Sequence, residues 1–343
     1  MSVEINGTDG ITYNDGSLQA SAPVGKNKII NGDMRVDQRD GTATINGTGV
    51  TYNVDRWLGR GETSEGVFTL AQDTTSPANF SNSLKATVTT DDDASPMWGT
   101  SSYRIQQMVE GYNIADLNWG TSDAQSVTLS FWVRSSVTGT LGGSVANGDY
   151  NRFNPFSYTI SSANTWEYKT VTIAGDTSGT WVTNNTLGLR LNFSLGAGAD
   201  RLGTAGTWTS SIKEGATGQV HPIQTNGSTF YITGVQLEAG TTATPFENLQ
   251  YGQQYALCQR YYQTLIDCNQ SYVNAGMHVG GRCQFNTEMR ANPTITSSVL
   301  ESGNVNNSYV YHKQSSNSFG YYHSASAAGN FYWYATFTMS SEL

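Results

Sequence analysis

Polar and apolar side chains alternate in many short segments of this chain, and this alternation limits the possible folds more than any other feature. Successive side chains of a β-strand point to opposite faces, so alternation predicts strands with one buried face and one wet face. Many such strands over about 220 residues predict a β-sandwich. The clearest segments are 82–89, 126–134, 166–173, 187–193 and 229–235.

Charged residues are few, and their balance is acidic. Only 13% of the side chains are charged, about half the usual share, whereas the chain holds 8 Trp, 19 Tyr and 12 Phe. A disordered chain would be charge-rich and aromatic-poor, so this composition predicts a folded β protein. The net charge of −9 and the absence of a Lys/Arg cluster argue against a nucleic-acid partner and against an anionic membrane surface.

The first 27 residues differ from the rest of the chain. Residues 1–27 contain two strand-like pieces among turn residues, with hairpin dipeptides at Asp9-Gly10 and Asp15-Gly16. A segment of this length cannot bury a core alone. We interpret it as an N-terminal arm that is ordered by a partner, through strand addition or trimerisation, with a flexible tail as the alternative.

The remaining residues divide into three predicted segments. The sandwich is expected over 28–248, with one helix near 102–109. Residues 247–267 break the strand pattern, because aromatic and apolar side chains recur at helical spacings of three and four. These side chains are Tyr251, Tyr255, Cys258, Tyr262 and Leu265. We predict a helical linker over 249–268 and a small C-terminal β domain over 269–343, which an oligomer would stabilise.

The sequence offers no catalytic motif. None of the 4 histidines has metal-ligand spacing to another His or Cys, and no Gly-x-Ser-x-Gly elbow or phosphate loop occurs. A glycosidase needs two opposed carboxylates, and sequence alone cannot pair the candidates. The candidates include Asp33, Asp37, Glu110, Asp116 and Glu238. We predict a protein that is not an enzyme, with a polysaccharide depolymerase as the lesser alternative.

The start of the chain and its cysteines indicate where the protein is made. Residues 1–4 lack the basic and apolar regions of a signal peptide, and no apolar run of about 18 residues could span a membrane. The 3 cysteines are too few for a disulfide framework. We expect synthesis in a reducing cytoplasm and no membrane insertion.

Aromatic side chains in or near predicted loops are the best candidates for a binding site. Sugars stack their apolar C–H faces on Trp and Tyr rings, while amides and hydroxyls bond the sugar hydroxyls. The predicted carbohydrate-binding residues are Trp98, Tyr112, Trp119, Tyr150 and Trp181. The alternative is that each ring fills the core or a subunit interface. Trp57, Trp132 and Trp166 lie within strand patterns and are predicted to be core residues.

Several segments, in order along the chain, resemble phage virion proteins. Residues 27–34 (NKIINGDM) are similar to the first strand of jelly-roll carbohydrate-binding modules. Residues 230–240 (FYITGVQLEAG) and 243–247 (ATPFE) resemble the closing strand of that domain in phage virion proteins. Residues 7–19 resemble the N-terminal lead of phage tail-fibre proteins, and residues 289–294 (MRANPT) resemble a strand of their C-terminal β modules.

This resemblance implies a phage tail fibre or similar virion appendage with a carbohydrate-binding-module-like jelly-roll domain. The expected fold is an all-β, antiparallel jelly-roll β-sandwich with a short N-terminal arm, a linking helix and a small C-terminal β domain. The expected partners are further copies in a homotrimer, other virion proteins bound through the arm, and a host-surface glycan bound during host attachment. The alternative is a purely structural head-fibre, capsid-decoration or tail-adaptor protein that binds no glycan.

Calcium is the one cofactor that the resemblance raises. In related modules a structural Ca²⁺ joins an Asp and an adjacent Glu of the first strand to an acid near the closing strand. Asp33 matches this Asp and Glu238 would be the closing acid, but Arg35 occupies the position where the Glu is expected. We therefore expect no cofactor, with Asp33 and Glu238 as the pair that a structural Ca²⁺ would use. The acidic run 91–93 is read as a solvated loop, with a second calcium site as the alternative.

Overall fold

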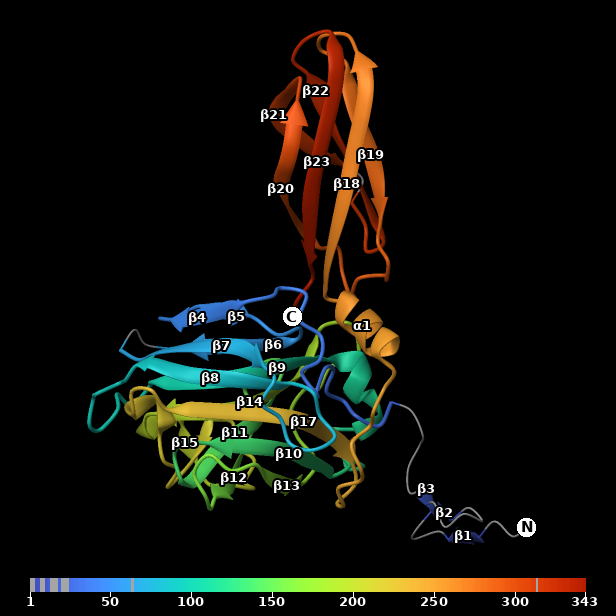
Figure 1. The fold of residues 1–343 in the computed structure, drawn as a ribbon. Coiled ribbons are helices and arrows are strands. Elements are labelled where there is room, and N and C mark those ends of the chain that lie inside the picture. Colours follow the sequence, from blue (N-terminus) through green and yellow to red (C-terminus); the bar gives the residue numbers. More distant parts are fainter. Residues whose placement is uncertain (1–3, 7–9, 13–17, 20–24, 63–64, 313) are drawn as a thin grey trace. The chain divides into compact units, whose positions relative to one another are not determined.

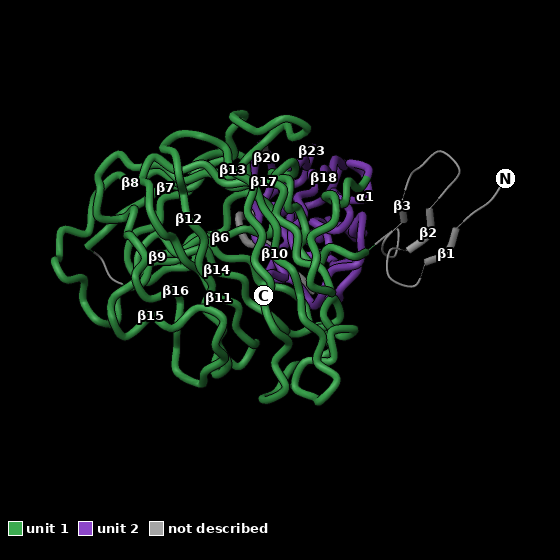
Figure 2. Tube along the Cα trace, turned by 90° about the horizontal axis from the view of Figure 1, so that it is seen from below, with its two compact units in different colours: residues 1–249 green, residues 250–343 purple. Residues whose placement is uncertain are grey.

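The structure is a computed structural model that describes residues 4–6, 10–12, 18–19, 25–62, 65–312 and 314–343. The chain divides into two compact units, residues 1–249 and residues 250–343, which Figure 2 shows in different colours. Both units consist mostly of strands, so the all-β prediction is confirmed (Figure 1). No helix within these ranges is long and apolar enough to cross a membrane.

The N-terminal residues contribute a small antiparallel sheet. Its strands, in spatial order, are β1 (Glu4–Asn6), β2 (Gly10–Thr12) and β3 (Leu18–Gln19). The sequence predicted strand-like pieces at the first two of these strands. Of the predicted hairpin turns, Asp9 and the dipeptide Asp15-Gly16 lie outside the described residues.

Two six-stranded antiparallel sheets enclose the core of the first unit. One sheet runs from edge to edge through β13 (Glu167–Ile173), β10 (Val127–Ser135), β17 (Thr229–Ala239), β8 (Ser83–Thr90), β7 (Val67–Asp73) and β4 (Thr42–Asn46). The other runs through β12 (Phe153–Ile160), β11 (Gly139–Asn147), β14 (Leu187–Ala197), β9 (Ser102–Glu110), β6 (Trp57–Gly61) and β5 (Val50–Tyr52). Several neighbouring strands are distant in the sequence, as a jelly roll requires, and the predicted jelly-roll sandwich is confirmed.

Shorter elements connect these strands. In the described part of the first unit they are the 3-10 helices η1 (Gly111–Leu117), η2 (Ala199–Arg201) and η3 (Pro222–Gln224) and the parallel pair β15 (Leu202–Gly203) and β16 (Gly215–Ala216). β16 contacts β11, β12 and β14 of the second sheet, whereas η1 and η3 add Ile114, Leu117 and Ile223 to the core.

The core between the sheets follows the predicted alternation. On β10, Phe131 and Val133 enter the core and are fully buried, whereas Trp132 points outward and is half-buried. Trp57 is buried as predicted and packs 6.4 Å from Phe193, measured between ring centroids. Burial of each large apolar side chain contributes about 1.5–3 kcal/mol, so the inward rows stabilise the sandwich and leave the outward rows for function.

One predicted helix is a strand. Residues 102–109 belong to β9, which lies inside the second sheet between β14 and β6. The helical prediction was wrong because β9 is buried on both faces, so its polar side chains do not mark a wet face. Tyr103 and Ile105 enter the core, whereas Arg104 and Gln106 point to the other face and find polar partners there.

The linking helix is shorter than predicted. α1 (Tyr251–Gln259) covers only part of 249–268, and the chain continues as strand β18 (Tyr262–Val273). Exposed side chains of β18 alternate with inward-facing ones, and the β-branched Thr264 and Ile266 favour a strand. The helix therefore ends at Gln259, whereas the predicted linker extended to residue 268.

The rest of the second unit consists of two three-stranded antiparallel sheets around a shared core. One contains β18, β23 (Gly329–Ser340) and β20 (Thr294–Gly303), and the other contains β19 (His278–Gln284), β22 (Ser318–Ala325) and β21 (Val305–His312). Phe319, Trp333 and Phe337 are fully buried between the sheets. Alternate residues of β23 face outward, as period-two strands require.

Candidate functional site

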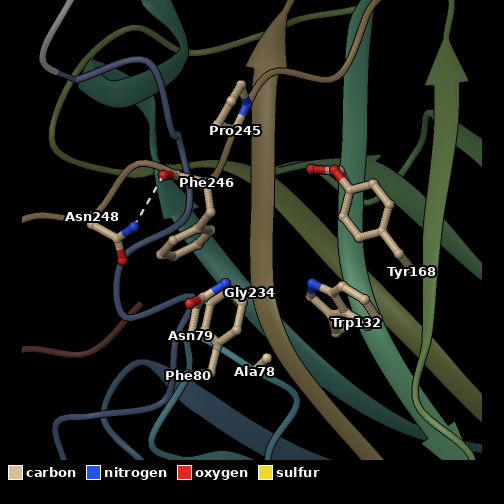
Figure 3. A pocket seen from close by; sticks show the side chains of 10 residues that line it. Ala78, Asn79, Phe80, Trp132, Tyr168, Gly234, Pro245, Phe246 and Asn248 are labelled. Atoms are coloured by element: carbon tan, nitrogen blue, oxygen red, sulfur yellow. Dashed lines mark hydrogen bonds between the residues drawn. The ribbon is translucent and has the colours of Figure 1, made fainter.

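A groove of about 470 Å³ lies on the outer face of the first sheet, over β10, β13 and β17 (Figure 3). Its size falls within the range of small-molecule sites, which is about 300–1,000 Å³. The lining residues are Ala78, Asn79, Phe80, Ser130, Trp132, Tyr168, Gly234, Pro245, Phe246 and Asn248. They come from five separate parts of the first unit, so only the folded sandwich assembles the groove.

A β-bulge at Gly234 forms the floor of the groove. Ser130 pairs with Gln236 and Trp132 pairs with Thr233, so β17 has one more residue than β10 at this point. Gly234 has a φ of 60°, which an L side chain rarely adopts. A Cβ at Gly234 would lie 2.6 Å from Cζ of Phe80, so glycine is needed for the space as well as for the backbone.

Two aromatic pairs line the groove. Trp132 and Tyr168 face each other across β10 and β13, with ring centroids 5.4 Å apart. Phe80, from the loop between β7 and β8, packs edge-on against Phe246, with centroids 5.2 Å apart. Tyr168 is 45% exposed, and Trp132 keeps part of its surface open. The groove therefore offers ring surfaces on which a flat apolar face can stack.

The polar groups in the groove are all neutral. Ser130 supplies a hydroxyl, and Asn79 and Asn248 supply amides at exposed positions. The amide of Asn248 donates only a long hydrogen bond, 3.4 Å, to the carbonyl oxygen of Phe246 (Figure 3). Since all ten lining side chains are uncharged, the groove suits a neutral ligand that carries both donors and acceptors.

The segment that carries Phe246 is anchored to β17. Glu238 accepts hydrogen bonds from the amide and the hydroxyl of Thr244, at 2.9 and 2.6 Å. The amide of Glu247 donates to the side-chain oxygen of Gln236 at 2.8 Å. The Glu247 carboxylate in turn accepts from the amide of Asn27 at 2.9 Å. These bonds hold the wall of the groove in place before a ligand arrives, which lowers the entropic cost of binding.

Trp98 and Tyr112, from the predicted aromatic set, are exposed but lie outside the groove. Their exposed fractions are 65% and 60%. Neither ring contacts another aromatic ring of the residues that the structure describes. Each of these two therefore offers a single ring rather than a lined site.

Trp119 and Trp181 lie in the core. They form a cluster with Trp208, in which the Trp119 centroid is 4.6 Å from that of Trp181 and 5.5 Å from that of Trp208. Only 5% of Trp119 and 8% of Trp181 is exposed. Neither ring has a free face for a sugar, because the loops that carry them fold back on the sandwich. Their burial agrees with the alternative prediction, in which these rings fill the core.

Tyr150 belongs to a different environment on the second sheet. Its hydroxyl donates to the Glu214 carboxylate, and the Arg190 guanidinium lies 4.9 Å from the centre of its ring. The five predicted residues are therefore not brought together. Trp132 was predicted to be a core residue because it lies within a strand pattern. The alternation of residues 126–134 does not show whether other parts of the chain cover the outer face of this strand.

Asp33 and Glu238, the pair that a structural Ca²⁺ would use, each have other partners in this structure. Asp33 forms an ion pair with Arg35, which already supplies positive charge, although burial raises the pKa of the Asp33 carboxyl. Both oxygens of Glu238 accept hydrogen bonds, from Gln236 and Thr244. No group of three or more His, Cys, Asp or Glu side chains that could hold a metal ion occurs among the described residues.

The likenesses to solved structures are distant. No family model matches the chain, and no curated protein matches it. The enzymatically active domain of tailspike protein 4 from bacteriophage CBA120 is 15% identical, with 63% of this chain and 22% of that chain covered and a TM-score of 0.32. This chain therefore spans about a fifth of that structure.

The descriptions of two further structures mention sugar binding or a bound sugar. A putative sugar binding protein from Bacteroides thetaiotaomicron is 13% identical, with 62% and 100% of the two chains covered and a TM-score of 0.35. A family 11 carbohydrate-binding module from Clostridium thermocellum, in complex with a mixed-linked tetrasaccharide, is 11% identical, with 55% and 91% covered and a TM-score of 0.28.

Proposed function

We propose that this protein is a non-enzymatic component of a bacteriophage virion, a tail fibre or similar appendage, that binds a host-surface glycan in the groove over β10, β13 and β17. The observation that supports glycan binding is a groove with two aromatic pairs and only neutral polar groups. The sequence resemblance to tail-fibre proteins supports the virion role.

The chemistry of the groove favours a neutral sugar. A pyranose presents an apolar C–H face and a rim of hydroxyls. Trp132 and Tyr168 can stack on that face, while Ser130 and the amides of Asn79 and Asn248 bond the hydroxyls. A charged ligand would find no counter-charge among the ten lining residues.

The same lining favours binding without cleavage. Glycoside hydrolysis uses two carboxyl groups placed on opposite sides of the scissile bond. The lining of this groove contains no Asp or Glu. A polysaccharide depolymerase would need another site, and cleavage of any oligosaccharide by the purified protein would favour that alternative over the present proposal.

We also propose a homotrimer, with the N-terminal arm docked on other virion proteins. On the outer face of the sheet formed by β18, β23 and β20, Ile266 is 72% exposed and Tyr272 is exposed as well, and Leu300 is exposed at the irregularity of β20. Apolar side chains gathered on one sheet favour contact with a second copy. Several copies would also multiply weak sugar contacts through high effective concentration.

A glycan array with matched tryptophan variants tests the glycan proposal. Trp132→Ala removes one ring of the groove, and the affinity for the best neutral glycan should fall about 30-fold or more, as for a central binding residue worth about 2 kcal/mol. Trp98→Ala removes an exposed ring elsewhere in the same unit and should leave binding unchanged. Equal losses in both variants, or no glycan bound by the wild type, would contradict the groove assignment.

Sedimentation of the full chain tests the oligomer. We expect a trimer that Ile266→Lys weakens, because a charge replaces an apolar side chain on the proposed contact face. A wild-type protein that stays monomeric at micromolar concentration would rule out the trimer. A trimer that binds no glycan would favour the purely structural alternative.

A further inference from the structure

The outer face of the second sheet carries a cluster of arginines. Arg60 on β6 lies opposite Arg104 on β9, and Arg190 on β14 lies opposite Met108, four residues further along β9. Residues four apart on a strand share a face, so all three guanidinium groups belong to the outer side of this sheet. Arg201, from η2, joins the same cluster through the acidic residues described next.

Two carboxylates balance only part of this charge. Glu62 pairs with Arg60 at 3.2 Å and with Arg104 at 2.9 Å. Glu214 is fully buried and pairs with Arg104 at 3.0 Å. Three of the four guanidinium groups, those of Arg60, Arg104 and Arg201, thus share two carboxylates, in a protein whose net charge is −9. The local excess of positive charge contrasts with the acidic balance of the whole chain.

Arg190 is the guanidinium that these carboxylates do not reach. No described Asp or Glu lies within ion-pair distance of it. Its contacts are the ring of Tyr150, the carbonyl oxygen of Gly148 at 3.4 Å and the sulfur of Met108 at 4.0 Å. Its Nε is buried and has no hydrogen-bond partner.

The electrostatics of Arg190 agree with this geometry. Burial, followed by the neighbouring charges of Arg60 and Arg104, lowers the pKa of Arg190 to about 10. The side chain stays protonated at neutral pH, but its charge is poorly compensated. An anion beside the Arg190 guanidinium would compensate its positive charge. A guanidinium binds a planar carboxylate through two parallel hydrogen bonds.

A neutral hydrogen-bond acceptor, the side chain of Gln106, lies between the pair of Arg60 and Arg104 and the pair of Arg190 and Met108. Gln106 occupies β9 between Arg104 and Met108 and donates to Asn192 at 2.7 Å, whereas its own Oε1 is buried without a partner. An unsatisfied buried acceptor is costly and favours a donor from a ligand or a water. A sugar acid carries both groups, a carboxylate for the guanidinium and a hydroxyl that can donate.

We propose that this face is a second saccharide site, in which Arg190, with Arg60 beside it, binds the carboxylate of an acidic sugar such as a uronic acid. The site lies on the opposite sheet from the groove and extends the proposed glycan binding to acidic sugars. Because this site and the groove lie on different sheets, either binding proposal can be refuted without refuting the other.

Calorimetric titration of the full chain with uronic-acid oligosaccharides, each compared with its neutral counterpart of the same linkage, tests this site. We expect the acidic oligosaccharide to bind with an affinity that falls as salt is raised from 0.05 to about 0.5 M. Arg190→Gln should lower that affinity about 10-fold or more, as for a charge-assisted hydrogen bond. Trp132→Ala should leave it unchanged.

Arg134→Gln is the matched control. Arg134 also lies over a tyrosine ring, that of Tyr231 at 4.8 Å, but on the other sheet, so its loss should not change binding of the acidic sugar. Arg60→Gln provides a second variant if Arg190→Gln fails to fold, and we expect a loss of about threefold or more. Thermal unfolding identifies a variant that does not fold.

Four results would overturn the proposal. The first is equal affinity for acidic and neutral oligosaccharides. The second is loss of acidic binding in Trp132→Ala, which would assign that binding to the groove. The third is unchanged affinity in folded Arg190→Gln. Acetate that competes as strongly as the oligosaccharide would indicate a simple carboxylate site and would overturn the assignment to a sugar.

Discussion

Replacement of Gly234 by alanine separates the stability of the sandwich from the shape of the groove. Gly234 is left-handed, with a φ of 60°, and an L residue in this conformation costs about 1–2 kcal/mol. For a domain of this size each kcal/mol lowers the melting temperature by about 2–4 °C, so Gly234→Ala should melt about 2–8 °C lower. The new Cβ would also lie 2.6 Å from Cζ of Phe80, where ordinary contact begins at 3.4 Å.

The second effect of Gly234→Ala acts on the ligand. The ring of Phe80 must move away from the new methyl group, and Trp132, whose Cδ1 would lie 3.2 Å from it, must give as well. Both rings line the groove, so we expect the affinity for the best neutral glycan to fall about 10-fold or more, or at least about 1.4 kcal/mol. Scanning calorimetry measures the melting temperature, and titration calorimetry measures the affinity.

Gly227 provides the control for this experiment. Its φ is 76°, and a Cβ there would meet nothing within 4 Å. Gly227→Ala should therefore lose a similar amount of stability and keep the affinity of the wild type. If Gly234→Ala binds as well as the wild type, or if Gly227→Ala loses affinity to the same degree, the reasoning about the floor of the groove is refuted.

Two further predictions concern stability. Arg152 binds the buried carboxylate of Asp176 through two hydrogen bonds of 2.7 Å, so Arg152→Ala should lower the free energy of unfolding by about 3–5 kcal/mol in chemical denaturation. The more open pair of Lys169 and Glu167 provides the comparison, because Lys169→Ala should lower the same free energy by less than about 1 kcal/mol. A similar loss in both variants would contradict the effect of burial. Burial lowers the pKa of the His221 imidazole in the folded protein, and the nearby charge of Asp92 opposes this shift in part. As pH falls below about 6.5, the imidazole therefore becomes protonated in the unfolded chain before it does so in the folded protein, and the contribution of His221 to the free energy of unfolding is lost. Denaturation at pH 7.5 and 5.5 should show a smaller loss for His221→Gln than for the wild type, and equal losses would contradict the prediction.

The sequence alone determined the class of the fold. The outward and inward rows of β10 follow directly from alternation, because the pleat of a strand has a period of two whatever surrounds it. The burial of Trp57 was predicted for the same reason. Alternation failed at 102–109, because a strand buried on both faces needs polar side chains on one of them and these resemble a wet face.

Only the tertiary structure decided where the candidate site lies. Alternation shows that Trp132 and Phe131 point to opposite faces, but not which face the second sheet covers. The loops that carry Trp119 and Trp181 fold into the core, and the bulge at Gly234 shifts the register within a single strand. The groove joins residues from Ala78 to Asn248, and contacts over such separations depend on how the sheets pack, which no local pattern contains.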